Sequence, residues 1–268
     1  MLANRLKVII VLVPLVVGFT AWGGWPFAGL IAAVMAVAAW EYVRIFHPGA
    51  HGSAAVLPLA GVVALILARQ AWGFTHSDWI LALIVLLAMG FQVVAQQCGS
   101  QTSASDFGMV LSSVLYLGWL GAYFISLRSL PDGQWWVLVV LPAVWAADAG
   151  AYIIGRRFGR RPLCSRVSPK KTWEGYLGGV AAAALLTPML AALWHLRAPA
   201  ITRLHGLQIG LVMAVLTPLG DLGESMLKRQ FGVKDSGKLL PGHGGIMDRV
   251  DSWIWAVTLG YYLVLWLS

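Results

Sequence analysis

Charged residues and cysteines are scarce in this chain. Only 11% of its 268 residues are Asp, Glu, Lys or Arg, whereas about a quarter are charged in a typical soluble domain. The two cysteines, Cys98 and Cys164, lie far apart and neither belongs to a metal-ligand spacing, so we expect free thiols. These shortages exclude an ordinary soluble domain and a disulfide framework.

Apolar residues are abundant instead, at 59% of the chain with 14 tryptophans and a mean hydropathy of +0.76. A bilayer core about 30 Å thick needs roughly 20 mostly apolar residues per helix. About nine stretches qualify, at residues 7–22, 25–46, 54–71, 78–96, 108–127, 134–155, 175–195, 207–227 and 252–267. We therefore predict an all-α, polytopic integral membrane protein without a separate soluble domain.

The first apolar stretch follows basic residues, as in a secretory signal. No clear small-residue cleavage site follows Thr20, and the Gly-Gly-Trp-Pro sequence at 23–26 favours a tight turn into a second helix. We expect this stretch to be retained as the first span.

Basic residues are unevenly divided between the two predicted membrane faces. With a cytosolic N-terminus and nine spans, 15 of the 19 fall on the inner side, leaving outside only Arg69, Arg128, Arg197 and Arg203. This bias predicts a cytosolic N-terminus and an outward C-terminus. The same bias explains the net charge of +8 by the membrane topology of the basic residues, so we expect no nucleic-acid partner.

Two polar loops, at 155–174 and 228–251, are separated by two predicted spans. An even number of spans returns both loops to one face, which the charge bias makes cytosolic. The first five spans are nearly free of charge, and the last four carry the motifs. We therefore predict a scaffold region, 1–130, and a catalytic region, 131–268.

The segment from Ser225 to Asp251 packs eight charged residues and several glycines into 27 positions. Glycines allow backbone N–H groups to approach anionic oxygens, and basic side chains can hold those oxygens. The residues that suit phosphate in this way are Lys228, Arg229, Lys234, Lys238, Gly242, Gly244 and Gly245. His243 is a lone imidazole, which we expect to donate to phosphate rather than to bind metal.

Asp148 and Asp221 each lie inside an apolar stretch, roughly 10 to 12 Å below the predicted interface. An aspartate deep in a membrane span costs about 2.5 to 3.5 kcal/mol on insertion scales and less near the edge of the span, so each is a candidate for function. The alternative is a polar contact between helices. Pro218 and Gly220 loosen the helix before Asp221, and Glu224 follows on the same face.

Asp248 and Asp251 are also three residues apart, at the predicted start of the last span. One interpretation is that they complement the helix dipole. The other is that they bind metal, because carboxylates without a Cys or His cluster suit a hard cation such as Mg²⁺.

The upstream loop carries seven basic residues before Glu174. Arg157, Arg160, Arg161 and Arg166 are better explained as charge that sets the membrane topology and contacts anionic lipid than as substrate contacts. We expect Ser168-Pro169 to form a turn that directs Lys170 and Lys171 to one point, as a triphosphate needs, while Thr172 and Glu174 cap the next helix. The alternative is an ordinary cap with solvated lysines.

These motifs together resemble those of the bacterial CDP-diacylglycerol synthases, also called phosphatidate cytidylyltransferases. The signature S-x-x-K-R-x4-K-D-x-G-x3-P-G-H-G-G-x-x-D-R-x-D is matched in full from Ser225 to Asp251. The other family-like motifs are Asp148-x-x-Ala-Tyr-x-x-Gly-Arg156, Ser168-Pro-Lys-Lys-Thr-x-Glu-Gly175 and Gly220-Asp-Leu-x-Glu-Ser225. They span about the last 120 residues, and the first five spans are similar only in hydropathy.

The resemblance implies transfer of a cytidylyl group from CTP to phosphatidate in phospholipid biosynthesis, with Mg²⁺ assistance, at the cytosolic face of the inner membrane. It implies catalytic roles for Asp221, Asp248, Lys170 and Lys171. Both acids would hold Mg²⁺, and Glu224 or Asp251 would help with a second cation. The substrate-binding residues would be Asp148, Arg156, Ser168, Glu174, Lys228, Arg229, Lys234, His243, Gly244, Gly245 and Arg249.

Two other functions remain open from the residues alone. A CTP-dependent lipid kinase acting on polyprenols also needs a basic loop and intramembrane carboxylates, but it releases CDP. A proton- or cation-coupled transporter would explain Asp148 and Asp221 but not the glycine-rich basic loop. The oligomeric state is open as well, including a homodimer through the apolar first half.

Overall fold

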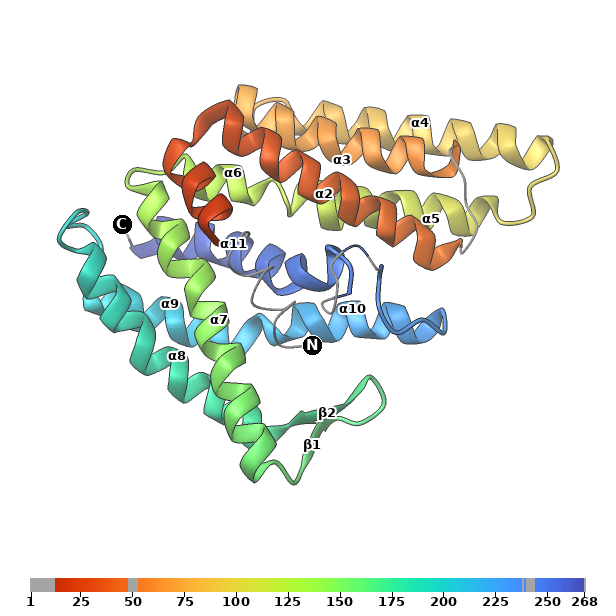
Figure 1. The fold of residues 1–268 in the computed structure, drawn as a ribbon. Helices are drawn as coiled ribbons and strands as arrows, with labels where there is room; N and C mark the ends of the chain where they lie inside the picture. Colours follow the sequence, from red (N-terminus) through yellow and green to blue (C-terminus); the bar gives the residue numbers. More distant parts are fainter. Residues whose placement is uncertain (1–12, 48–52, 238, 240–243, 268) are drawn as a thin grey trace. The chain divides into compact units, whose positions relative to one another are not determined.

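The computed structural model describes residues 13–47, 53–237, 239 and 244–267, which are mostly helical (Figure 1). Its described part contains eight stretches long and apolar enough to span a membrane: Gly24–Phe46, Ala55–Trp72, Ser77–Gln97, Ser103–Arg128, Gly133–Phe158, Trp173–Trp194, Arg203–Gln230 and Met247–Leu267. A shorter apolar helix, Val13–Trp22, falls within the predicted first span. The chain is therefore an all-α polytopic membrane protein, as predicted.

The chain forms two compact units. Met1–Ser126 and Asp235–Asp248 make up the first, and Leu127–Lys234 and Arg249–Ser268 make up the second. Part of the glycine-rich segment thus folds with the N-terminal spans. The predicted scaffold region, 1–130, and catalytic region, 131–268, stay predictions.

The first unit is built on α2 (Gly24–Phe46), α3 (Ser53–Trp72), α4 (Ser77–Gln97), α5 (Ser103–Ser113) and the π-helical η1 (Val114–Trp119). Its first chain segment ends within α6 (Tyr123–Arg128), after Ser126. Buried Phe27, Met35, Ile66 and Leu117 contribute to its core. Gly118 allows η1 to approach α3, because a Cβ there would lie 3.0 Å from the Cα of Val62. The π-helical turn is thereby fixed against its neighbour.

The second unit contains α7 (Gly133–Phe158), the strands β1 (Pro162–Cys164) and β2 (Ser168–Thr172), α8 (Trp173–Trp194), α9 (Arg203–Leu216), α10 (Pro218–Gln230) and most of α11 (Met247–Leu267). Small residues let α7 and α8 pack closely, as is common between membrane helices. A Cβ on Gly150 would meet the carbonyl oxygen of Gly178 at 2.7 Å, and one on Gly179 would meet that of Ala147 at 2.6 Å.

The segment between α7 and α8 is a β-hairpin, which the sequence did not predict. Its turn lies at residues 165–167, so the expected turn at Ser168-Pro169 is wrong, and both residues belong to β2. Pro169 is tolerated there because a two-stranded sheet consists of edge strands. The predicted cap is confirmed for Thr172, whose Oγ1 accepts from the N–H of Gly175 at 3.2 Å.

The predicted span 207–227 is divided at Thr217. Helix α9 ends at Leu216, and α10 begins at Pro218, where a missing N–H costs no helical hydrogen bond. The predicted loosening of the helix is therefore confirmed. As a result, Asp221 lies in the first turn of α10, directly after a break in the helix inside the stretch Arg203–Gln230.

Candidate active site

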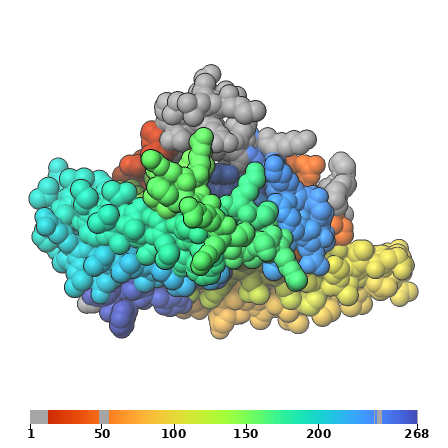
Figure 2. Space-filling view, turned by 90° about the horizontal axis from the view of Figure 1, so that it is seen from below, coloured from red at the N-terminus to blue at the C-terminus, as the bar shows by residue number. Residues whose placement is uncertain are grey.

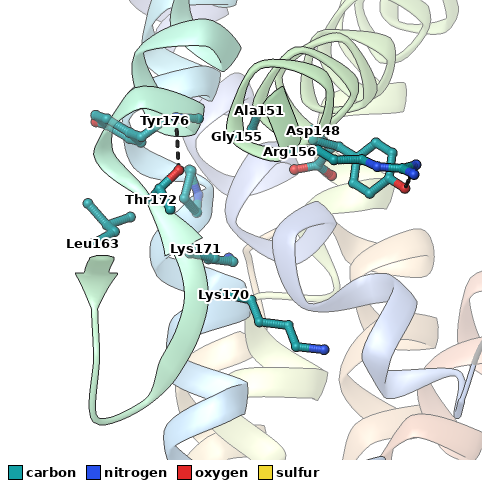
Figure 3. A pocket seen from close by; sticks show the side chains of 12 residues that line it. Asp148, Ala151, Gly155, Arg156, Leu163, Lys170, Lys171, Thr172 and Tyr176 are labelled. Atoms are coloured by element: carbon teal, nitrogen blue, oxygen red, sulfur yellow. Dashed lines mark hydrogen bonds between the residues drawn. The ribbon is translucent and has the colours of Figure 1, made fainter. Parts of the chain in front are cut away.

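A cavity of about 400 Å³ opens in the second unit (Figure 3). Its walls are mainly apolar, with a few charged groups. The lining residues come from α7, the hairpin, the start of α8 and the start of α10: Asp148, Ala151, Tyr152, Gly155, Arg156, Leu163, Lys170, Lys171, Thr172, Gly175, Tyr176 and Pro218. Figure 2 views the molecule from the side where the hairpin reaches the surface. An apolar pocket with a few convergent polar groups is typical of a ligand site.

The hairpin is fixed against α7 and α8 at both of its ends. A Cβ on Gly155 would lie 3.3 Å from both the Cα of Gly175 and Oγ1 of Thr172, so the glycines permit this close approach. At the other end, Oε2 of Glu174 accepts from the backbone N–H groups of Arg160 at 3.0 Å and Arg161 at 3.2 Å. Glu174 therefore anchors the loop before β1 and does not complete a helix cap.

Lys170 and Lys171 extend from β2 in the same direction in Figure 3. The ammonium of Lys171 forms an ion pair with the carboxylate of Asp221, and both side chains remain partly exposed, at 29% and 39%. Asp148 interacts electrostatically with Lys171 and Asp221. The structure thus gathers four of the predicted site residues around one cavity region.

A second group of carboxylates lies where α10 meets α11. Glu224 and Asp251 are buried, and Asp251 interacts with Asp221 and Glu224. Lys228 pairs with Glu224 at 3.2 Å. Gly220 permits the approach of the two helices, because a Cβ there would lie 2.7 Å from the carbonyl oxygen of Asp251. The predicted metal ligands Asp221, Glu224 and Asp251 therefore belong to one charged cluster.

The first unit contains a polar centre around Glu41, which the sequence analysis missed. Glu41 lies on α2 and is 1% exposed. Its carboxylate accepts from the backbone N–H groups of Ile246 at 3.1 Å and Met247 at 2.8 Å, and from the hydroxyl of Ser236 at 3.0 Å. The only signal in the sequence is a single acid within the apolar stretch 25–46.

Asp248 belongs to the same centre. Its Oδ2 accepts from the N–H of Ser236 at 3.1 Å and from the N–H of Gly245 at 2.8 Å. Gly244 has a φ of +81°, which favours glycine, and a Cβ on Gly245 would collide with the carboxylate of Glu41. Asp248 thus joins Ser236 to Gly245, and the Gly245 N–H already has a hydrogen-bond partner.

The pattern of the cytidylyltransferase family matches residues 3–267 of the chain. A phosphatidate cytidylyltransferase of Bacillus subtilis (strain 168) is 33% identical over 249 residues, covering 90% of each protein. One from Pseudomonas aeruginosa is 33% identical over 274 residues, covering 99% of this chain and 97% of the relative. The chain belongs to the cytidylyltransferase family. It is therefore a nucleotidyltransferase.

The donor chemistry of this cytidylyltransferase suits a hard cation. Among the described residues, no three His, Cys, Asp or Glu side chains converge in a metal-binding arrangement. Mg²⁺ commonly uses only one or two carboxylates together with substrate phosphates. Asp221 already attracts a cationic group, the Lys171 ammonium, so it fits such a role. Asp221 and Asp248 belong to different units, and their joint binding of Mg²⁺ stays a prediction.

The remaining predicted residues of the cytidylyltransferase lie in varied settings. Arg156 lines the cavity and donates to the hydroxyl of Tyr152 at 3.2 Å. Arg249 is exposed and interacts electrostatically with Asp148. Arg229 donates to the carbonyl of Val233 at 3.4 Å. Ser168 is in β2 opposite Cys164, and Lys234 is exposed. Lys238, Gly242 and His243 lie outside the described residues, so their predicted phosphate contacts stay predictions.

Proposed function

We propose that this cytidylyltransferase transfers the cytidylyl group of CTP to phosphatidate, giving CDP-diacylglycerol and pyrophosphate. The observation that carries the proposal is the cavity lined by Asp148, Lys170 and Lys171, where Lys171 pairs with the carboxylate of Asp221. A nucleoside triphosphate needs such concentrated positive charge, and the partly apolar walls suit a lipid acceptor. The names of the curated relatives support the same substrates.

The reaction needs little proton chemistry from the protein. A phosphate oxygen of phosphatidate attacks the α-phosphorus of CTP, a new P–O bond forms, and the bond to the β-phosphate oxygen breaks. That nucleophile is already ionised at neutral pH, so no side chain has to act as a general base. The protein's contribution is to align the two phosphates and to neutralise charge.

Lys170 and Lys171 would neutralise the charge that develops on the departing pyrophosphate. The carboxylate of Asp221 holds the Lys171 ammonium in the absence of substrate. An arriving triphosphate would replace that carboxylate as the partner of Lys171, which leaves Asp221 available to a cation.

Asp221 and Asp248 would hold Mg²⁺, with Glu224 or Asp251 helping to hold a second cation. When bound, Mg²⁺ supplies charge neutralisation on the CTP phosphates. The buried Glu224–Lys228 pair would keep the surrounding carboxylates in place.

The proposed site faces the cytoplasm, at the inner membrane of a bacterial cell. This orientation follows from the positive-inside bias and from the need of CTP to arrive from the cytosol. Phosphatidate would present its head group at the interface while its acyl chains stay in lipid. The cavity-lining Tyr152 is exposed, as are Ile153 and Leu177, the chain neighbours of lining residues, and these apolar side chains are suited to contact those acyl chains.

Product analysis of the purified protein tests the proposal. Labelled CTP, phosphatidate and varied Mg²⁺ should yield CDP-lipid and pyrophosphate in equal amounts. Release of CDP with a phosphorylated alcohol would instead indicate a lipid kinase. Ion or solute flux in vesicles without nucleotide turnover would indicate a transporter.

A further inference from the structure

We propose that Glu41 is a positioning residue for the transfer reaction, holding Ser236 and the backbone of Gly245 to Met247 so that Asp248 is correctly placed. This inference rests on the proposed function for its consequence in catalysis. Its structural basis lies entirely within the first unit. Glu41 acts through its neighbours, and we assign it no contact with substrate.

The burial of Glu41 requires its hydrogen bonds. A carboxylate that is 1% exposed is costly unless donors replace its lost water, and charge-assisted hydrogen bonds are the strong ones. Two of its three donors, the N–H groups of Ile246 and Met247, lie at the start of α11. Such groups have no partner within their own helix, and the helix dipole favours an anion there. Glu41 thus acts as a helix cap supplied by α2.

Ser236 links Glu41 to Asp248. Its hydroxyl lies 3.0 Å from Oε2 of Glu41 and 3.0 Å from Oδ2 of Asp248. One hydroxyl proton serves one acceptor at a time, so the two carboxylates share this donor. Gly245 fits between the same groups, since a Cβ there would collide with both Ser236 and Glu41. A displacement of Glu41 would therefore also displace Asp248, because Ser236 and Gly245 contact both carboxylates.

The primary variant is Glu41→Gln, which keeps the size of the side chain. The amide nitrogen cannot accept a hydrogen bond, so at least one of the three donors loses its partner. We expect faster hydrogen exchange of the Gly245, Ile246 and Met247 amides, with unchanged exchange in α3 and α4. We also expect kcat to fall about 10- to 100-fold, the usual range for a lost positioning partner, while KM for phosphatidate stays unchanged.

Asp106→Asn is the matched control. Its carboxylate also lies in the first unit, where it pairs with His47 and accepts from the hydroxyl of Thr102 at 2.9 Å. Asp106 has no role in the proposed reaction. We therefore expect its variant to leave both the exchange of the 245–247 amides and kcat near the wild-type values.

Ser236→Ala provides a second route if Glu41→Gln does not fold. Alone, it should accelerate exchange at 245–247 and lower kcat. Combined with Glu41→Gln, it should give less than the sum of the two effects, because both variants interrupt one network. Additive effects would contradict the link through Ser236.

Two results would overturn the proposal. Wild-type kcat in Glu41→Gln despite faster exchange at 245–247 would deny Glu41 a part in catalysis. Faster exchange throughout the first unit would show that Glu41 stabilises the whole unit and does not specifically position Asp248. Failure of the proposed function gives a different result, in which the wild type makes no CDP-lipid. The exchange measurement still shows in that case whether Glu41 holds the backbone at 245–247.

Discussion

Glu41 in the first unit and Asp221 in the second are both acids within apolar stretches, but their partners differ. Glu41 is 1% exposed and accepts from two backbone N–H groups and a hydroxyl. Asp221 is 39% exposed and pairs with the flexible ammonium of Lys171. Fixed backbone donors suit an acid that holds a segment in place. An exchangeable ammonium suits an acid that must release its partner to a ligand.

Asp221→Asn should give the largest effect, because it removes the charge that attracts Lys171 and the proposed cation. We expect kcat to fall at least about 100-fold, with the protein still inserted and folded. Incorporation of labelled CTP into lipid measures this effect. Asp248→Asn should lower kcat to a similar extent, and it should additionally accelerate exchange of the Ser236 and Gly245 amides, which donate to Asp248. Near-normal turnover in either variant would refute its proposed metal role.

Lys170→Ala should affect CTP more than the lipid substrate. Loss of one charge-assisted hydrogen bond to phosphate predicts about a 10- to 100-fold lower kcat/KM for CTP. Steady-state kinetics with each substrate varied in turn measures the difference. Lys171→Ala should be more harmful, because Lys171 also pairs with Asp221. An unchanged KM and kcat for CTP in Lys170→Ala would remove this lysine from the site.

Gly220→Ala tests whether close packing of α10 on α11 places Asp221. The new Cβ would lie 2.7 Å from the carbonyl oxygen of Asp251, so we expect a loss of about 1 to 3 kcal/mol in stability and reduced turnover. Gly223→Ala is a matched control one turn later, because a Cβ added there would meet no neighbouring atom within 4 Å. Thermal unfolding in detergent compares the two. Equal effects would contradict the packing argument.

Glu174→Ala should give the smallest effect. It removes the acceptor of the Arg160 and Arg161 N–H groups, which lie at the protein surface. We expect faster hydrogen exchange of those two amides and at most a few-fold loss of turnover, since Thr172 still caps α8. A loss as large as that of Asp221→Asn would instead support direct substrate binding by Glu174.

Much of the fold could be predicted because each membrane span carries its own apolar signal. The span predicted at 25–46 is α2 (Gly24–Phe46), and the one at 78–96 is α4 (Ser77–Gln97). The break in the helix before Asp221 could also be predicted, because Pro218 and Gly220 indicate it within a few residues of sequence. The ion pair of Lys171 with Asp221 joined two motifs that the sequence had placed on one face.

The polar centre around Glu41 could not be predicted in the same way. Its hydrogen bonds join residues as far apart as Glu41 and Met247, and no spacing in the sequence reports such a contact. Topology alone permits it, since six of the described spans lie between α2 and Ser236, an even number that returns the chain to one face. The hairpin was not predicted, because the polar residues between α7 and α8 are compatible with several turns, of which the expected one at Ser168-Pro169 is only one.

The most direct test of the account exchanges the charges of the second unit's ion pair. A variant that combines Lys171→Asp with Asp221→Lys keeps an ion pair between the hairpin and α10. In this variant the negative charge lies on the hairpin and the positive charge lies on α10. We predict a folded protein that incorporates no labelled cytidylyl group into lipid, because both groups serve ligands in the reaction. Transfer at close to the wild-type rate would show that the pair is structural only, and it would contradict the proposed site.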